Sequence, residues 1–400
     1  MISITRDIGL VSFTGNPIML GVQSYNHEDG SGNPRPFYTI FCEIFTSNPS
    51  GGGDPYDVLS INPDANGVGQ FDLAPVLKDL TKPTLPWPVE AETQAVKDTN
   101  ATVSFWYRLR DGYGVPFVQQ AVGHTSSAYR AIPGGLSDEI LEQIEDDTSN
   151  CYAFLSANKI FLTSIPEKKR TYPTQVELLR FFNYKQVVYQ QDKFHLVLRQ
   201  HFWNGSFSDS IKWSGTLDAL SIYTFNVTPS HLNISENTVW WEVYFMKTDE
   251  LMPDEDPEVV SEKVSYRKNE EHPTNPRLLV MQNSLGGFDT LVAVGNRTIT
   301  SEGEAASGYV AKTSAVRKWL QPLQERRVSK SIYKGSLGYF TNDELTWLRE
   351  FFNSPEKYLF DGGRLESVML RNNDFPAQTD EPPGKIEIEA VLGSPFSLFF

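Results

Sequence analysis

The sequence predicts a mainly β protein built from several β-sandwich domains with a few short helices. Aromatic residues make up 12% of the chain, with 25 Phe, 17 Tyr and 8 Trp, and there are 25 Pro and 28 Gly. Aromatic side chains favour strands, and Pro and Gly favour the turns that separate them. A length of 400 residues allows roughly two to four domains.

Two stretches divide the chain. Leu136–Asp147 is acidic and has Ser137 at the N-cap position, which predicts a connecting helix. Met246–Pro276 is dense in charge and contains prolines, which predicts an exposed linker or loop. The predicted parts are an N-terminal β-sandwich (1–135), a helical connector (136–149), a middle β-sandwich (150–247), a charged linker or loop (248–275) and a C-terminal β-rich domain with one helix (276–400).

The clearest local signal for a hairpin is Pro276–Gly295. An apolar run, Leu278–Met281, is followed by a turn that contains Gly286 and Gly287, and the chain returns as Phe288–Val294. Two β-prone runs joined by such a turn predict a hairpin. A phosphate loop would need a helix after the glycines, and a calcium loop would need more oxygen ligands than Asp289, so both alternatives are disfavoured.

Alternation and turn residues predict the other strands. In the first domain, Phe37–Phe45 predicts a strand, and Thr102–Leu109 with Val115–Val122 predicts a hairpin that turns at Asp111-Gly112. The strands expected in the middle domain are Phe154–Thr163, Thr174–Phe182, Gln186–Gln190, Lys193–Leu198, Ser221–Val227 and Thr238–Met246.

A helix is predicted near 341–353. Thr341 and Glu344 have the spacing of a capping box, and Leu345, Leu348 and Phe352 follow at helical spacing. Lys385–Leu392 alternates apolar and charged residues and predicts a half-exposed strand near the end of the sequence.

The bulk properties exclude several classes of protein. The formal net charge is −15 and the pI is about 4.9, whereas a nucleic-acid binder would show a basic face. No apolar run approaches the length of a membrane helix, and no signal peptide is visible, so we expect cytoplasmic synthesis and no membrane insertion. Cys42 and Cys151 are expected to be free thiols in cores.

The sequence contains no motif that predicts catalysis. It lacks a G-x-S-x-G elbow, a P-loop, an H-E-x-x-H pair and a dinucleotide fingerprint. His195 and His201 do not have ligand spacing, and the acidic run Asp249–Asp256 lacks the spaced ligands and glycine of an EF-hand. We therefore expect no enzyme activity, no catalytic residues, no cofactor and no metal.

One strand suggests a contact surface. Val239–Phe245 alternates, so Trp241, Val243 and Phe245 face the core while Trp240, Glu242 and Tyr244 form the other face. An aromatic body with a polar tip suits stacking on sugar rings or packing against another subunit. Trp240 and Tyr244 are therefore the candidate residues for a glycan or subunit contact.

Several stretches resemble structural proteins of the tail and baseplate of phages and prophages of Bacteroidota bacteria. The resemblance rests on the turn block Leu278–Thr290, on Phe13–Ile18, on Phe161–Thr163 with Pro166 and Lys169-Arg170, and on Thr341–Ser354. These similarities are spread over most of the chain. The family provides no active site to transfer.

The resemblance implies a virion protein of the distal tail or baseplate region. Such a protein would act by oligomeric assembly, as a ring or trimer, and through contacts with neighbouring tail proteins. The alternative is a host-attachment adhesin that binds surface polysaccharide, with Trp240 and Tyr244 stacking on sugars. A polysaccharide-cleaving enzyme is the third and weakest possibility.

Overall fold

The structure is a computed structural model, and it describes most of the chain. The described residues are 2–87, 95–143, 151–189, 192–249, 256–269, 275–294, 309–313, 318–322, 331–338, 340–361, 364–371 and 386–392. They form two compact units. The first unit is Met1–Asn269 with Asn283–Asp289, and the second is Glu270–Gln282 with Thr290–Phe400. The prediction of a mainly β chain with few short helices is confirmed.

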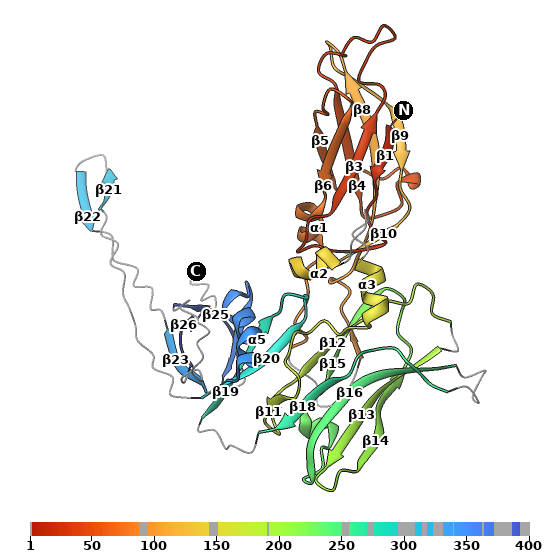
Figure 1. Cartoon of the computed structure of the whole chain (residues 1–400). Helices are drawn as coiled ribbons and strands as arrows, with labels where there is room; N and C mark the ends of the chain where they lie inside the picture. The colour runs from red at the N-terminus through yellow and green to blue at the C-terminus, as the bar shows by residue number, and fades with distance from the viewer. Residues whose placement is uncertain are drawn as a thin grey trace. The chain divides into compact units, whose positions relative to one another are not determined.

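The first unit begins with a β-sandwich (Figure 1). One sheet has the order β1-β3-β6, and the other has the order β2-β10-β8-β4-β5 with β9 also paired to β8. The elements are β1 (Ile2–Arg6), β2 (Val11–Phe13), β3 (Met19–Ser24), β4 (Thr39–Phe45), η1 (Pro49–Gly51), β5 (Asp57–Ile61), β6 (Val68–Asp72), α1 (Ala74–Leu80), β8 (Val103–Tyr113), β9 (Val118–Thr125) and β10 (Tyr129–Ile132). Alternate residues of each sheet meet in one core, as Leu20 from β3 and Ile40 from β4 illustrate.

A second sandwich follows in the same unit. Its larger sheet has the order β11-β18-β16-β13-β14 with β17 also on β16, and its smaller sheet has the order β12-β15-β7. The elements are β7 (Ala95–Lys97), β11 (Lys169–Thr171), β12 (Leu178–Asn183), β13 (Asp192–Phe202), β14 (Phe207–Gly215), β15 (Ser221–Asn226), α4 (Pro229–Leu232), β16 (Thr238–Asp249), β17 (Glu258–Val259) and β18 (Val264–Lys268). Between the two sheets, the Phe245 ring packs on Phe181 and Phe225, with ring centroids 4.6 and 4.8 Å away.

The two sandwiches share a third hydrophobic cluster. It contains Phe13 and Ile132 from the first sandwich and Phe182 and Ile222 from the second. Two short helices, α2 (Asp138–Gln143) and α3 (Cys151–Asn158), contribute Leu155 and other apolar side chains to this cluster. In addition, β7 comes from the N-terminal part of the sequence but pairs with β15. The predicted N-terminal and middle regions therefore form one compact unit.

The second unit contains a closed six-stranded sheet in the order β19-β20-β23-β26-β25-β24. Its elements are β19 (Pro276–Gln282), β20 (Phe288–Val294), β23 (Ser331–Gly338), α5 (Asn342–Asn353), β24 (Lys357–Asp361), β25 (Arg364–Leu370) and β26 (Ile386–Leu392), and β21 (Tyr309–Thr313) pairs separately with β22 (Lys318–Pro322). Both strands of the predicted hairpin have the expected bounds within two residues. The half-exposed strand near the end is also confirmed as β26.

Helix α5 confirms the capping box in atomic detail. The Glu344 backbone N–H donates to the Thr341 hydroxyl at 3.3 Å, and the Thr341 N–H donates to the Glu344 carboxylate at 2.8 Å. Leu345, Leu348 and Phe351 are buried, so the helix packs one apolar face.

We expect Thr341→Ala to lower the free energy of unfolding of the second unit by about 1 kcal/mol, because the Glu344 N–H loses its side-chain acceptor, the Thr341 hydroxyl. Urea unfolding would measure this. Thr346→Ala is the matched control, because Thr346 is exposed on the same helix. The control should be neutral or slightly stabilising, since alanine is the better helix former.

The structure corrects the predicted strand Phe154–Thr163. Residues 151–158 are helix α3, in which Cys151 and Leu155 are buried one helical turn apart. The pattern of a short apolar run does not by itself distinguish a helix from a strand. Here the two buried residues, Cys151 and Leu155, are four apart, which is the spacing of one face of a helix. The connector helix is confirmed only for 138–143, because 144–150 lie outside the described residues.

The hairpin predicted to turn at Asp111-Gly112 turns later. Strand β8 continues to Tyr113, and β9 starts at Val118. Asp111 is buried, and its carboxylate accepts hydrogen bonds from the Tyr38 hydroxyl at 2.6 Å and the Asn26 amide at 2.9 Å. An Asp-Gly pair favours a turn, but a buried carboxylate is tolerated inside a strand when hydrogen-bond donors satisfy it, as Tyr38 and Asn26 do here.

Two further predictions differ from the structure. Gln186–Tyr189 forms a loop and no strand, and Gln190 lies outside the described residues. Strand β18 lies within the stretch that the sequence predicts as a linker or loop. Val264 and Tyr266 of β18 are buried in the core of the second sandwich, and this core contact orders a stretch whose flanks are highly charged.

Cys42 and Cys151 are free and buried, as expected. Burial raises the pKa of both thiols. Among the described helices, none has the length and apolar composition needed to cross a membrane.

Candidate functional site: the β13–β14 hairpin

Trp240 lies on the outer face of the larger sheet of the second sandwich, but its ring is already occupied. The imidazole of His201, its partner across β13 and β16, stacks on it with ring centroids 3.6 Å apart and an interplanar angle of 6°. The Lys168 ammonium lies 4.7 Å from the centre of the same indole. Stacking of a sugar on the covered face of Trp240 would require His201 to move.

Tyr244 is not on an exposed platform. Only 3% of the residue is accessible, and burial raises the pKa of its hydroxyl. The Arg199 guanidinium carbon lies 5.8 Å from the ring centre and the Lys263 ammonium lies 5.2 Å from it. The alternation that placed Trp240 and Tyr244 on one face is correct, but the expected exposure of Tyr244 is wrong because long cationic side chains cover it.

The remaining outer face is a paired charge network. Arg199 donates through Nε and Nη2 to the two carboxylate oxygens of Asp209 at 2.7 and 2.8 Å. This bidentate hydrogen bond lowers the pKa of Asp209 and raises that of Arg199. Glu242 accepts from Lys263 at 3.2 Å and lies 3.5 Å from His201. The charged side chains of this network are therefore paired with one another.

The exposed apolar side chains lie next to this network, on the hairpin that β13 and β14 form. Trp203 is 74% exposed, Phe207 57% and Ile211 59%. Exposed apolar side chains gathered on one strand and its turn make this hairpin a candidate contact surface. None of the three was selected in the sequence analysis.

The turn that presents Trp203 is well defined. The Phe202 N–H donates to the Ser206 carbonyl at 2.9 Å, and the Gly205 N–H donates to the Phe202 carbonyl at 3.0 Å. Gly205 has a φ of +79°, which favours glycine, and the Asn204 carboxamide oxygen accepts from the Ser206 N–H at 3.0 Å. The indole is therefore held out by an ordered loop. The Asn204-Gly205 pair is a strong hairpin signal that could have located β14 from the sequence.

Strand β14 is the edge of its sheet, next to β13 (Figure 1). Among the described strands, only β13 pairs with it. The register runs regularly from Phe207 opposite His201 to Ile211 opposite Val197, and it then shifts, so that Trp213 lies opposite Leu196 and Lys212 is the extra residue. The flat part of the edge is therefore Phe207–Ile211.

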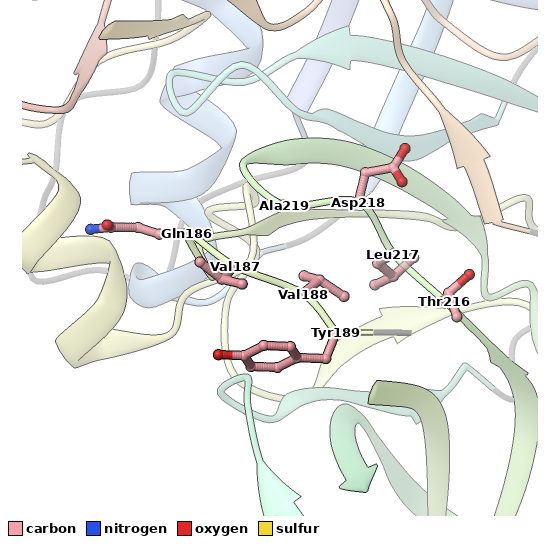
Figure 2. A pocket seen from close by; sticks show the side chains of 8 residues that line it. All are labelled: Gln186, Val187, Val188, Tyr189, Thr216, Leu217, Asp218 and Ala219. Carbon is pink, nitrogen blue, oxygen red and sulfur yellow. The ribbon is translucent and has the colours of Figure 1, made fainter. Parts of the chain in front are cut away.

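A shallow depression of about 500 Å³ lies between two loops of the second sandwich. Figure 2 shows Val188 and Leu217 pointing toward one another across it, whereas Gln186 and Asp218 point away. The Asp218 carboxylate is paired with the Lys97 ammonium at 2.6 Å. Among the described residues of the lining, Asp218 is the one carboxylate and is held by Lys97, so we assign no chemistry to this depression.

Other residues considered in the sequence analysis have structural partners. The ring nitrogens of His195 lie 2.8 Å from the hydroxyls of Ser214 and Thr248. Asp289, in β20 just after the Gly-Gly turn, accepts from the Thr163 hydroxyl at 2.6 Å. Within the described residues, no three His, Cys, Asp or Glu side chains lie close enough together to hold a metal ion.

Comparisons with known proteins leave this surface unassigned. No family model matches the chain, and no curated protein matches it. A solved structure to which it shows a weak likeness is the crystal structure of S. aureus TarS, with 9% identity and a TM-score of 0.15. That alignment covers 80% of this chain and 42% of the TarS chain. At this TM-score the likeness carries no argument about fold or activity.

Proposed function

We propose that the chain is a structural protein of a phage tail, in the distal tail or baseplate region. It would be made in the host cytoplasm, join the virion, and act by assembling with itself and with neighbouring tail proteins. The proposal involves no enzymatic activity, no cofactor, no nucleic acid and no membrane insertion.

One structural observation supports an assembly role. The edge strand β14 and its turn expose Trp203, Phe207 and Ile211 together, each more than half accessible. An exposed apolar edge strand is an aggregation hazard in an isolated protein, and a partner that covers it in an assembly removes the hazard. The chain's charge of −15 supports solubility of the free subunit before it is incorporated.

The sequence resemblance determines which assembly we propose. The blocks at Phe13–Ile18, Leu278–Thr290 and Thr341–Ser354 resemble tail and baseplate proteins. The described residues form β-sheets with few helices, and this secondary structure is compatible with a tail or baseplate protein. The proposal thus combines a resemblance in sequence with an exposed edge in structure.

Light scattering of the purified protein, alone and after mixing with intact tails, tests the proposal. We expect a closed oligomer or stable incorporation into tails. A monomer that binds no virion component would contradict the proposal. Release of reducing sugar from host polysaccharide would contradict the absence of enzymatic activity.

The second candidate is a host-surface glycan-binding adhesin, and the exposure of Trp203 favours it. An indole that is 74% exposed on an ordered turn provides a flat apolar face for a sugar ring. Retention on a column of host polysaccharide would support this candidate if Trp203→Ala abolished it. Trp240→Ala is the matched comparison, because the Trp240 ring is stacked on His201 and should contribute little.

A further inference from the structure

The flat part of the β14 edge has a simple internal symmetry. Asp209 is its central residue, and Phe207 and Ile211 lie two positions away on either side. All three side chains lie on the outer face of the sheet, because residues two apart in a strand share a face. The turn Trp203–Ser206 limits this segment on one side, and the extra residue Lys212 limits it on the other.

We infer that two copies of this chain pair antiparallel through β14, around a two-fold axis that passes beside Asp209. This deepens the proposed assembly role and rests on it, since it names a second copy as the partner. In a symmetric antiparallel pair, a residue lies opposite the residue of the second copy that is equally far from the axis in the other direction, and both side chains are on the same side of the sheet. The axis at Asp209 places Phe207 opposite Ile211 of the second copy, and Ile211 opposite its Phe207.

Other symmetric registers would pair fewer residues of this edge. Moving the axis to Ser208 or Ser210 shortens the paired segment, because the turn or the bulge then enters the pairing. With the axis at Asp209, both apolar side chains on the edge face an apolar partner. Aromatic and β-branched side chains directly opposite one another are among the stabilising cross-strand pairs.

The negative charge of Asp209 at the axis would oppose this pairing, but Arg199 neutralises it. The same register places Asp209 opposite Asp209 of the second copy, and like charges directly opposite destabilise a sheet. Each carboxylate accepts hydrogen bonds from Nε and Nη2 of its own Arg199, at 2.7 and 2.8 Å. The two strands therefore present two neutral ion pairs to one another, and Arg199 acts as a positioning and neutralising residue for the interface.

Apart from the charge of Asp209, which Arg199 pairs, the segment carries no other common protection of an edge strand against pairing. Natural edge strands are protected by charged side chains, lysine above all, by proline or by bulges. The segment Phe207–Ile211 contains no proline and no lysine, and the bulge with Lys212 lies beyond its end. The unprotected length coincides with the length that the two-fold register would cover.

Thiol cross-linking in the full chain tests the register. Two variants are prepared, Phe207→Cys and Ile211→Cys, and each is treated with a short bis-maleimide alone and in an equal mixture. The native Cys42 and Cys151 are buried and should not react. We expect a covalent dimer in the mixture at a yield at least about tenfold above either variant alone, because only the mixture brings two thiols face to face.

Each variant alone is the matched control, because it retains the same exposed thiol without an opposing one. A cross-linked yield from one variant alone equal to that of the mixture would overturn the register. The absence of any dimer in the mixture would overturn the pairing itself.

A second measurement tests the role of Arg199. Arg199→Gln leaves two unneutralised carboxylates facing one another, so we expect the dimer dissociation constant to rise at least about tenfold in light scattering. Adding Asp209→Asn to this variant should restore the dimer. Failure of the double variant to recover, with an unchanged circular dichroism spectrum, would contradict the role of Arg199.

These results are separable from the proposed function. If the wild-type protein joins tails but none of the β14 experiments shows pairing, the second copy is not the partner of this edge, and the tail assignment stands. If the β14 dimer forms but the protein binds no virion component, the pairing stands and the tail assignment fails.

Discussion

Asp98→Ala is expected to lower the free energy of unfolding of the first unit by about 3–5 kcal/mol, because the change leaves a buried charge without its partner. Arg180 is 1% exposed and donates through Nη2 to the Asp98 carboxylate, which is 4% exposed. That carboxylate also accepts from the backbone N–H groups of Thr84 at 2.7 Å and of Asn100 and Ala101 at 3.1 Å. Urea unfolding followed by fluorescence would measure the loss.

The effect should be large because few other groups stabilise the buried charge of Arg180. Its Nη1 donates to the Gly286 carbonyl at 2.9 Å, and its Nε has no hydrogen-bond partner among the residues that the structure describes. Burial lowers the pKa of Arg180 even with the carboxylate of Asp98 beside it. Without that carboxylate, the cost of keeping the guanidinium charged inside the protein is no longer offset.

Asp218→Ala is the matched control for Asp98→Ala. Asp218 pairs with Lys97, the residue before Asp98, but the two side chains are 66% and 39% exposed. Exposed ion pairs contribute little because water screens them, so the expected loss is below about 1 kcal/mol. Equal losses in the two variants would show that burial does not determine the contribution of the Arg180–Asp98 pair.

The features that the sequence predicted well are those determined by local interactions. The capping box of α5 needs only Thr341 and Glu344, and the β19–β20 hairpin needs two apolar runs and a glycine turn. Their residues are neighbours in the sequence, so spacing and residue type suffice to predict them.

The features that the sequence mispredicted depend on distant contacts. Residues 151–158 became a helix because Leu155 packs in a cluster with Phe13 and Ile222, which are far away in sequence. Asp111 remained inside a strand because Tyr38 and Asn26 supply its donors. Local propensity is overridden where tertiary packing is stronger, and an isolated window of sequence cannot reveal that packing.

The candidate site was missed for a related reason. Aromatic content directed the prediction to Trp240 and Tyr244 in the most strongly alternating strand, which lies in the middle of its sheet. The less apolar segment Phe207–Gly215 became the edge, and an edge exposes what a central strand covers. The order of strands in a sheet decides exposure, and that order is not visible in the pattern of one strand.

Gly287→Ala is expected to lower the free energy of unfolding of the first unit by roughly 3 kcal/mol, because a Cβ at this position collides with the backbone carbonyl of Leu162. The turn Asn283–Asp289 belongs to this unit and is held there by close contacts. The Asn283 side chain accepts from the Gly287 N–H at 2.8 Å and donates to the Leu162 carbonyl at 3.1 Å. A methyl group forces the turn away, so these buried polar groups lose their partners.

Two measurements would check the Gly287→Ala prediction. Urea unfolding gives the free energy, and hydrogen exchange of the Gly135 amide reports on the turn directly, because that N–H donates to the Ser284 carbonyl at 2.7 Å. Gly30→Ala is the control, since a Cβ there meets nothing within 4 Å. The prediction would be wrong if the two variants had the same free energy of unfolding and the Gly135 amide kept its protection from exchange. The chain at Leu162 could then move aside, and close packing would not explain why glycine occupies position 287.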